Sequence, residues 1–189
     1  MRIRPCVALL LAGLAATAGA HPHTWIDGGF SLELDSAGLR AVQVTWVFDP
    51  FTSSDLLFSY DADGNGVISR AESGAFYENA FQTLESIGYF VLAEVSGAPL
   101  DIPEPRDFRA STRDGRLIYE FTLPMRVPIG EMGTLLLALF DPSYYVSFTS
   151  EAVTEQYRAG PRTIALRDEV IRLESVGWGT ITVPALRVE

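Results

Sequence analysis

Apolar residues that alternate with polar ones over long stretches are the feature that most constrains the fold of this chain. Such alternation runs from residue 26 to 34 and from 42 to 48, on either side of a glycine-containing break at 35–38. A period of two places every second side chain on one face of a strand, so these two segments predict a β-hairpin. Alternation returns at 117–123 and 144–148, and Asp114-Gly115 predicts a tight hairpin turn before the first of these strands.

Other segments complete the expected secondary structure. The apolar run at 135–140 predicts a central strand buried on both faces, and short strands are expected at 163–166 and 180–183. Asp49 and Pro50 are typical of a helix start and predict a helix over 50–60. Apolar residues at 77, 81, 84 and 87 predict a second helix that ends at Gly88. We therefore expect an α+β fold: an antiparallel sheet, or sheets, with an EF-hand-like helix–loop–helix inserted after the first hairpin.

The domain organisation has two interpretations. The segment 97–105 contains Pro99, Pro103 and Pro105 and is a candidate boundary. Residues 21–96 would then hold the first hairpin and the helix–loop–helix, and residues 97–189 a β-rich second half, unless both form one continuous domain. The tripeptide Phe-Asp-Pro occurs at 48–50 and 140–142, each time after an apolar strand. Two related halves would explain this, but a strand ending twice in an Asp-Pro turn is the simpler explanation.

Residues 1–20 have the three-part pattern of a cleaved secretory signal peptide. Arg2 and Arg4 precede an apolar run at 7–14, and small residues close the segment at 18–20. No later stretch approaches the roughly 20 apolar residues that a spanning helix needs. We expect an exported protein with no integral membrane segment in the mature chain. The single cysteine, Cys6, would be removed, so the mature chain could form no disulfide.

Composition narrows the function classes. Without Arg2 and Arg4 the net charge is about −12, which makes nucleic acid an improbable partner because phosphate binding depends on a basic surface. The mature chain would have no cysteine and no lysine, and its only histidines are His21 and His23. A serine triad or a histidine-brace copper oxygenase would need an imidazole in the folded body, and no carboxylate spacing supports glycoside cleavage. We therefore expect a protein that is not an enzyme.

The sequence DADGNGVISRAE, at 61–72, matches the pattern of a twelve-residue calcium loop without a mismatch. Side-chain or backbone oxygens are expected at loop positions one, three, five, seven, nine and twelve, and Gly66 permits the sharp turn at six. The expected Ca²⁺ ligands are Asp61, Asp63, Asn65, Val67, Ser69 and Glu72. The simpler alternative is a surface turn rich in Asp, Asn and Gly. Sensor loops usually occur in pairs and this sequence has one, so a structural calcium is favoured over a regulatory one.

The two histidines predict a second site. If cleavage follows Ala20, the new amino group, His21 and His23 offer three nitrogen ligands suited to Zn²⁺, Cu²⁺, Ni²⁺ or Co²⁺. Pro22 has no N–H to lose, which excludes the square-planar copper or nickel mode that uses backbone amides. Additional ligands could come from carboxylates at 27, 49 and 141, namely Asp27, Asp49 and Asp141. The alternative is a frayed terminus that carries two histidines by chance.

Three segments resemble a known family of exported bacterial proteins of uncharacterised function, often labelled the periplasmic component of an ABC-type transport system. They are HPHTWID at 21–27, VTWVFDPF at 44–51 and LFDPSYYVSF at 139–148. The resemblance implies a periplasmic location and a role beside nickel/cobalt-type permeases of the inner membrane. The strand-rich pattern does not look like the longer, two-lobed binding proteins of such systems.

Two functional hypotheses follow. The first is an exported metal-handling accessory protein with a structural Ca²⁺ at 61–72 and a transition-metal site on His21 and His23, acting with a membrane permease. The second is a calcium-stabilised interaction module of a transport system in which the histidines are incidental. Metal titration of a variant lacking both histidines separates the two.

Overall fold

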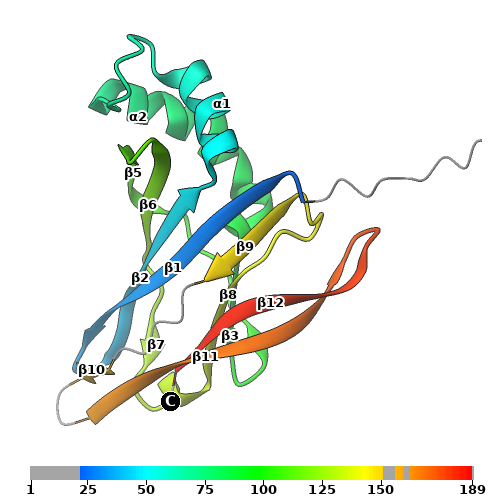
Figure 1. Ribbon diagram of the computed structural model, residues 1–189. Helices are drawn as coiled ribbons and strands as arrows, with labels where there is room; N and C mark the ends of the chain where they lie inside the picture. The colour runs from blue at the N-terminus through cyan, green and yellow to red at the C-terminus, as the bar shows by residue number, and fades with distance from the viewer. Residues whose placement is uncertain (1–21, 151–155, 160–161, 189) are drawn as a thin grey trace, which may run out of the picture.

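The computed structural model describes residues 22–150, 156–159 and 162–188, which form two β-sheets with helices at one end (Figure 1). The first sheet has the strand order β5-β6-β2-β1-β9, and β7 pairs with the end of β2. All neighbours are antiparallel except β1 and β9, which run parallel. The strands are β1 (Thr24–Asp35), β2 (Gly38–Phe48), β5 (Arg106–Arg113), β6 (Arg116–Leu123), β7 (Val127–Pro128) and β9 (Val146–Ser150).

The second sheet has the order β10-β11-β12-β8-β3-β4 and is antiparallel throughout. A short 3-10 turn, η3 (Met132–Thr134), leads into its central strand. Both sheets take strands from before and after residue 97. The strands are β3 (Val91–Val95), β4 (Ala98–Pro99), β8 (Leu135–Leu139), β10 (Gln156–Ala159), β11 (Arg162–Ser175) and β12 (Gly179–Val188).

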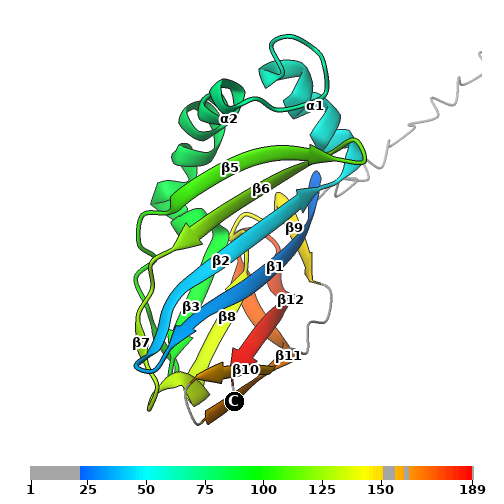
Figure 2. The same ribbon diagram turned by 90° about the vertical axis from the view of Figure 1, so that its left-hand side faces the viewer.

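The core lies between the two sheets, which face one another as layers (Figure 2). Alternating residues of β1 and β2, such as Ile26, Val44 and Trp46, are buried on one face, as their period of two predicts. β8 is buried along its whole length. Leu135, Leu137 and Leu139 face this core. Leu136 and Ala138 belong to a second apolar cluster on the other face of the sheet. The predicted first hairpin, the Asp114-Gly115 hairpin and the doubly buried central strand are confirmed.

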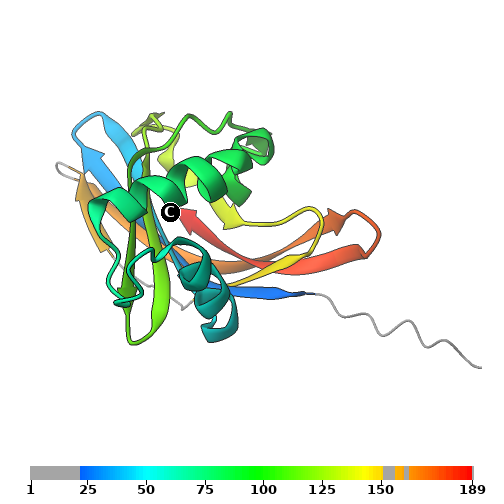
Figure 3. The ribbon, with the colours of Figure 1, turned by 90° about the horizontal axis from the view of Figure 1, so that it is seen from above.

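Helical segments cover one end of the sandwich, as the view from above shows (Figure 3). Asp49 caps α1 (Pro50–Tyr60), as predicted, by accepting hydrogen bonds from two N–H groups of the first turn. α2 (Arg70–Phe76) continues into a π-helical segment, η1 (Tyr77–Phe81), and a 3-10 segment, η2 (Gln82–Phe90). Phe76 and Phe81, both fully buried, carry these segments onto the first sheet.

The prediction of an α+β fold with an EF-hand-like helix–loop–helix is wrong. The described chain is mostly β, with two six-stranded sheets and little α-helix. α2 has only seven residues, and the segment that follows it is not α-helical. The apolar residues at 77, 81, 84 and 87 serve to pack the π and 3-10 turns on the sheet, and Ile87 already has non-helical backbone angles. The loop is therefore followed by a seven-residue α-helix that continues as π and 3-10 turns, in place of the full second helix of an EF-hand.

Among the described residues, no helix is long and apolar enough to cross a membrane.

A candidate cation-binding loop and the start of β1

The loop at 61–69 is held at both ends by helix capping. Asp61 ends α1, and its backbone N–H bonds to the carbonyl of Leu57. Ser69 starts α2 in a capping box: its hydroxyl accepts from the N–H of Glu72, and the Glu72 carboxylate accepts from the N–H of Ser69 at 2.8 Å. The helix ends therefore determine where the first and last acidic residues of the loop lie.

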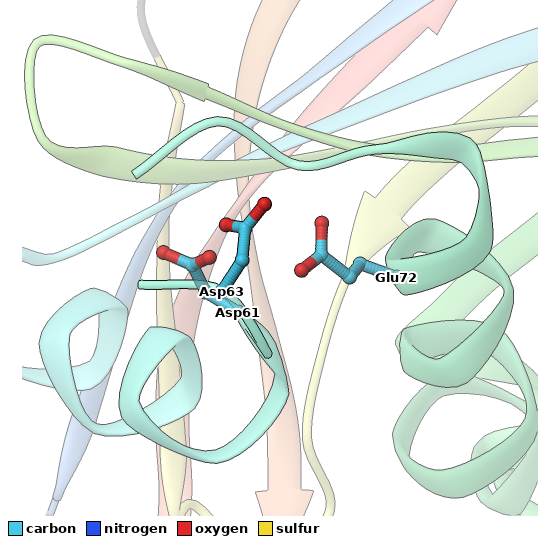
Figure 4. Close-up of side chains that lie close together, drawn as sticks. All are labelled: Asp61, Asp63 and Glu72. Carbon is cyan, nitrogen blue, oxygen red and sulfur yellow. The ribbon is translucent and has the colours of Figure 1, made fainter. Parts of the chain in front are cut away.

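Three of the six predicted calcium ligands come together. Carboxylate oxygens of Asp61, Asp63 and Glu72 lie within 4.8 Å of one another (Figure 4). Asp63 is exposed, Asp61 is half-buried and Glu72 is buried, so the cluster has one open side. Three carboxylates at this separation repel one another, and a cation between them would remove that repulsion.

Hydrogen bonds orient two of these carboxylates. Asp61 accepts from the N–H of Gly66 at 2.8 Å through Oδ2, and Glu72 accepts from the N–H of Ala62 at 2.8 Å through Oε1. The backbone and hydroxyl of Ser69, with the backbone of Ala62 and Asp63, hold the pKa of Glu72 below its ordinary value. Oδ1 of Asp61 is buried and has no hydrogen-bond partner within the part of the chain that the structure describes. A buried oxygen without a hydrogen-bond partner needs another partner, and a bound cation would provide it.

The remaining predicted ligands are Asn65, Val67 and Ser69, and two of them contact the cluster through N–H groups: the amide of Asn65 donates to Asp63, and the backbone of Ser69 donates to Glu72. Asn65 accepts from the N–H of Val67 at 2.6 Å and donates its amide to Asp63 at 2.7 Å. Val67 is an exposed residue, and its predicted contribution is the backbone carbonyl, while the Ser69 hydroxyl accepts from the N–H of Glu72 in the α2 cap.

The loop is also attached to the first sheet. The hydroxyl of Thr112 in β5 donates to the carbonyl of Gly66 at 2.6 Å. One turn into α2, the hydroxyl of Ser73 accepts from the N–H of Ala110, also in β5, at 2.9 Å. These two hydrogen bonds fix the loop and the start of α2 to β5, the edge strand of the first sheet.

The predicted histidine site lies at the start of β1. His21 lies outside the described residues. His23 is exposed, donates its backbone N–H to the carbonyl of Tyr145 at 2.9 Å, and stacks its ring on Tyr145 with centroids 4.9 Å apart. His23 is thus held in the fold directly before β1.

Each of the three proposed additional ligands has a structural role. Oδ1 of Asp49 accepts from the N–H of Phe51 and Thr52, and Oδ2 accepts from the Thr52 hydroxyl at 2.7 Å and the N–H of Trp25 at 3.0 Å. Partial burial tends to raise the pKa of Asp49, but these hydrogen bonds outweigh it and hold the pKa below its ordinary value. Asp49 thus joins the start of α1 to β1.

Asp27 and Asp141 are likewise engaged. Asp27 accepts from the Thr149 hydroxyl at 2.6 Å and pairs with Arg116 at 2.8 Å, and these two partners hold its pKa below the ordinary value. Buried Asp141 accepts from the N–H and hydroxyl of Ser143 and from the N–H of Val146 at 2.8 Å, and so forms the turn into β9.

Two features were not predicted from the sequence. Arg116 donates to the carbonyl of Phe48 at 2.6 Å and of Val47 at 3.0 Å while pairing with Asp27, which fastens the end of β2. Residues 22–27 and the segments VTWVFDPF and LFDPSYYVSF converge at the start of β1 through Asp49, Tyr145 and the parallel pairing with β9. The repeated Phe-Asp-Pro was the signal for this convergence, because each copy supplies the aspartate of a turn there.

These observations define a β-sandwich protein that carries a small acidic cluster at the helical end of its sheets. Comparison with known proteins places it further: the chain belongs to the family described as "Protein of unknown function (DUF1007)", which matches residues 6–165.

Two relatives are described only as uncharacterised. A 15.5 kDa protein encoded in the trpE 3' region of Spirochaeta aurantia is 24% identical over 113 residues, covering 60% of this chain and 76% of the relative. A protein of Haemophilus influenzae is 27% identical over 145 residues, covering 74% of this chain and 68% of the relative. No solved structure matches the chain. The relationship to an uncharacterised family is confirmed, and the transport label remains an expectation.

Proposed function

We propose that this protein is an exported metal-handling protein whose loop at 61–72 binds a structural Ca²⁺. The observation that carries the proposal is the cluster of Asp61, Asp63 and Glu72, in which Oδ1 of Asp61 is buried with no partner in the described chain. A buried, charged oxygen without a partner is costly, and a cation would satisfy it and its neighbours together.

The chemistry of the cluster favours calcium. All its candidate ligands are oxygens, and hard cations such as Ca²⁺ and Mg²⁺ take oxygen ligands, whereas Zn²⁺ and Cu²⁺ favour imidazole and thiolate. Mg²⁺ demands near-ideal octahedral geometry, while Ca²⁺ tolerates irregular coordination at 2.3 to 2.6 Å. Carboxylate oxygens up to 4.8 Å apart fit around one ion at such distances.

The ion would act as a staple between the helices and the sheet. Asp61 ends α1, Glu72 lies in α2, and Gly66 of the same loop is bonded to Thr112 of β5. An ion that fixes the loop therefore fixes both helix ends against the sandwich. A dissociation constant of about 10⁻⁴ to 10⁻³ M suffices for a protein exported into a calcium-rich compartment.

Calorimetric titration with CaCl₂ tests the site directly. The parent protein is expected to bind one Ca²⁺ per chain, and Asp61→Asn is expected to lose this binding. Asp101→Asn makes the same charge change at an exposed position in the β4–β5 connection and serves as the control. If Asp61→Asn binds as the parent does, the loop is not the site.

A second, transition-metal site is proposed at the start of β1. It rests on His23, whose backbone is bonded to Tyr145 and whose exposed ring stacks on that residue, so the imidazole is presented at a defined place. Because Asp27, Asp49 and Asp141 are engaged elsewhere, the ligands would be the amino group after residue 20, His21 and His23. The protein would deliver the metal to an inner-membrane permease, or regulate that permease when the metal binds.

Titration with Zn²⁺, Ni²⁺, Co²⁺ and Cu²⁺ tests this second site. The processed protein is expected to bind at least one of these metals tenfold more tightly than a His21→Ala, His23→Ala variant. Equal affinities would instead favour a non-enzymatic interaction module in which the histidines are incidental. Mass spectrometry of the exported protein checks that processing leaves His21 first.

A further inference from the structure

The loop at 61–69 projects from one end of the molecule. It joins α1 to α2 at the end opposite to the end of β12, as two perpendicular views show (Figures 1 and 2). Residues 62–67 are all exposed. A planar surface that approaches this end therefore meets the loop before it meets either sheet.

Two large apolar residues stand exposed beside the acidic cluster. Phe58 and Val67 are 92% and 66% exposed. Phe58 lies three residues before Asp61, whose N–H still makes the helical bond to the carbonyl of Leu57, so Phe58 and Asp61 are neighbours on the surface of α1. Val67 lies in the loop itself and donates its N–H to the side chain of Asn65. Exposed apolar side chains that gather at one place indicate an interaction surface.

Arginine side chains without acidic partners flank the same loop. Arg70 is the first residue of α2, and Arg113 ends β5 next to Thr112, whose hydroxyl donates to the carbonyl of Gly66. Both arginines are exposed, and within the described ranges neither forms an ion pair, although the chain has 24 acidic residues and 14 basic ones. A guanidinium group binds phosphate through two parallel hydrogen bonds. The surroundings of the loop therefore complement an anion as well as a cation.

The acidic cluster leaves room for a ligand from outside the chain. Ca²⁺ takes about six to eight oxygen ligands, which is more than three carboxylates provide when each binds through one oxygen. The Asn65 side-chain oxygen accepts from the N–H of Val67, and the Ser69 hydroxyl accepts from the N–H of Glu72. Asp63 lies on the open, exposed side of the cluster (Figure 4). An oxygen from another molecule would reach the ion from that side.

We propose that Ca²⁺ in this loop binds the phosphate of a phospholipid headgroup and so docks the protein on a membrane surface. This inference rests on the proposed calcium site and adds a partner to it. Phosphate oxygens are hard ligands of the kind that Ca²⁺ takes, and Arg70 and Arg113 donate to the same layer of headgroups. Without calcium the three carboxylates repel an anionic membrane, so docking depends on the ion.

The exposed apolar residues favour a lipid over free phosphate. Free phosphate would leave Phe58 and Val67 in water, whereas a membrane interface removes their apolar surface from water when the loop inserts. Aromatic side chains are also frequent at the level of lipid headgroups.

Sedimentation with phospholipid vesicles tests the proposal. The vesicles contain phosphatidylglycerol, which is anionic, and phosphatidylethanolamine. The parent protein is expected to bind them at least tenfold more tightly in about 1 mM CaCl₂ than in the same concentration of MgCl₂ or in chelator. Asp61→Asn is expected to lose the calcium-dependent binding, and it also controls for vesicles that aggregate in calcium.

Matched variants test the apolar and basic parts of the surface. Phe58→Gln is expected to weaken vesicle binding about tenfold, while Phe51→Gln, the same change at the opposite end of α1, is expected to have little effect. Arg70→Gln is expected to weaken binding about fivefold, and Arg126→Gln, at an exposed position after β6, is its control. An unchanged melting temperature in chelator shows that each variant is folded.

The proposal is overturned if vesicle binding is the same in calcium and in chelator, or if Asp61→Asn binds vesicles as the parent does. It is equally overturned if either Phe58→Gln or Arg70→Gln leaves vesicle binding unchanged. Calorimetric titration with CaCl₂ alone separates this inference from the calcium site. A parent that binds calcium but no vesicles retains the structural staple and refutes the membrane surface. Calcium-dependent vesicle binding without calcium binding in solution would support the membrane surface and refute the staple.

Discussion

Calcium should stabilise the folded protein by an amount set by the proposed affinity of the 61–72 loop. A ligand that binds only the folded state stabilises it by RT ln(1 + [L]/Kd). At 10 mM Ca²⁺ and a Kd of about 10⁻³ to 10⁻⁴ M this is about 1.4 to 2.7 kcal/mol. For a chain of this size each kcal/mol moves the melting temperature by about 2 to 4 °C, so the expected rise is about 3 to 11 °C.

The structure also determines how Asp61→Asn should behave. Asparagine retains an oxygen for the N–H of Gly66 but removes one of three mutually repelling charges. Without calcium the variant should be as stable as the parent or slightly more stable. With calcium the variant should lack the rise in melting temperature. The variant should therefore melt at the same temperature as the parent or slightly higher without calcium, and at a lower temperature than the parent with calcium.

Thermal unfolding followed by circular dichroism measures both effects, in 10 mM CaCl₂, in 10 mM MgCl₂ and in chelator. The magnesium sample matches the ionic strength, and Asp101→Asn controls for the change in net charge. If calcium and magnesium give the parent the same melting temperature, the staple is refuted. If Asp61→Asn gains as much from calcium as the parent does, the stabilisation arises elsewhere.

Three other predictions concern side-chain contacts of α1 and of the first sheet. Ser53→Ala should lower the free energy of unfolding by about 1 to 3 kcal/mol in urea titrations, because the buried hydroxyl accepts from a backbone N–H of β6 at 2.9 Å; exposed Ser54→Ala should change it little. Asp49→Ala should cost about 0.5 to 2 kcal/mol at neutral pH through the lost helix cap. The folded-state pKa of Asp49 lies below its ordinary 3.8, so this stabilisation is present above about pH 4 and is lost as the pH falls through the folded pKa. Below pH 4 the free energy of unfolding of the variant should therefore change less with pH than that of the parent. Equal changes would show that the cap does not contribute. Arg116→Ala should raise the pKa of Asp27 toward its ordinary value in an NMR titration, and an unchanged pKa would show that Thr149 alone lowers it.

Short-range patterns predicted the parts of the fold that depend on neighbouring residues. The first hairpin and the 113–116 hairpin follow from alternation and turn chemistry, and both occur with the expected pairing. The start of α1 was equally predictable, because Asp49 and Pro50 act on the adjacent turn. Leu135 to Leu139 were correctly interpreted as a strand buried on both faces, since a continuous apolar run needs apolar neighbours on each side.

Long-range pairing explains what was missed. The parallel pairing of β1 with β9 joins residues 24 and 146, and the pairing of β3 with β8 joins 91 and 139. Neither pairing has a local signal, and together they build a mostly-β structure of two sheets, where an α+β fold with an antiparallel sheet, or sheets, and an EF-hand-like insertion was expected. The helical pattern after residue 76 was real, but Phe81 and Tyr89 are buried against the sandwich, and the backbone adopts π and 3-10 turns to place them.

The candidate sites divide in the same way. Asp61, Asp63 and Glu72 lie within twelve residues, so their spacing alone brings them together once both helix ends are capped. For the histidine site, Asp27, Asp49 and Asp141 were candidate additional ligands, and the sequence could not show that each is engaged by other partners.

The engagement of the three aspartates narrows what the start of β1 can bind. Asp49 and Asp141 each hold a turn, and those turns deliver the backbone of Phe48–Pro50 and Tyr145 to β1. A metal that recruited either carboxylate would compete with the backbone N–H groups of Trp25 and Val146 that these carboxylates accept from. We therefore expect the affinity of the proposed site to come from nitrogen ligands, which predicts a preference for Cu²⁺, Ni²⁺ or Zn²⁺ over oxygen-seeking cations. The acidic loop has the opposite preference, so the two proposed sites should fill independently: Ca²⁺ should leave the histidine signals unchanged, and Zn²⁺ should leave the melting gain from Ca²⁺ intact.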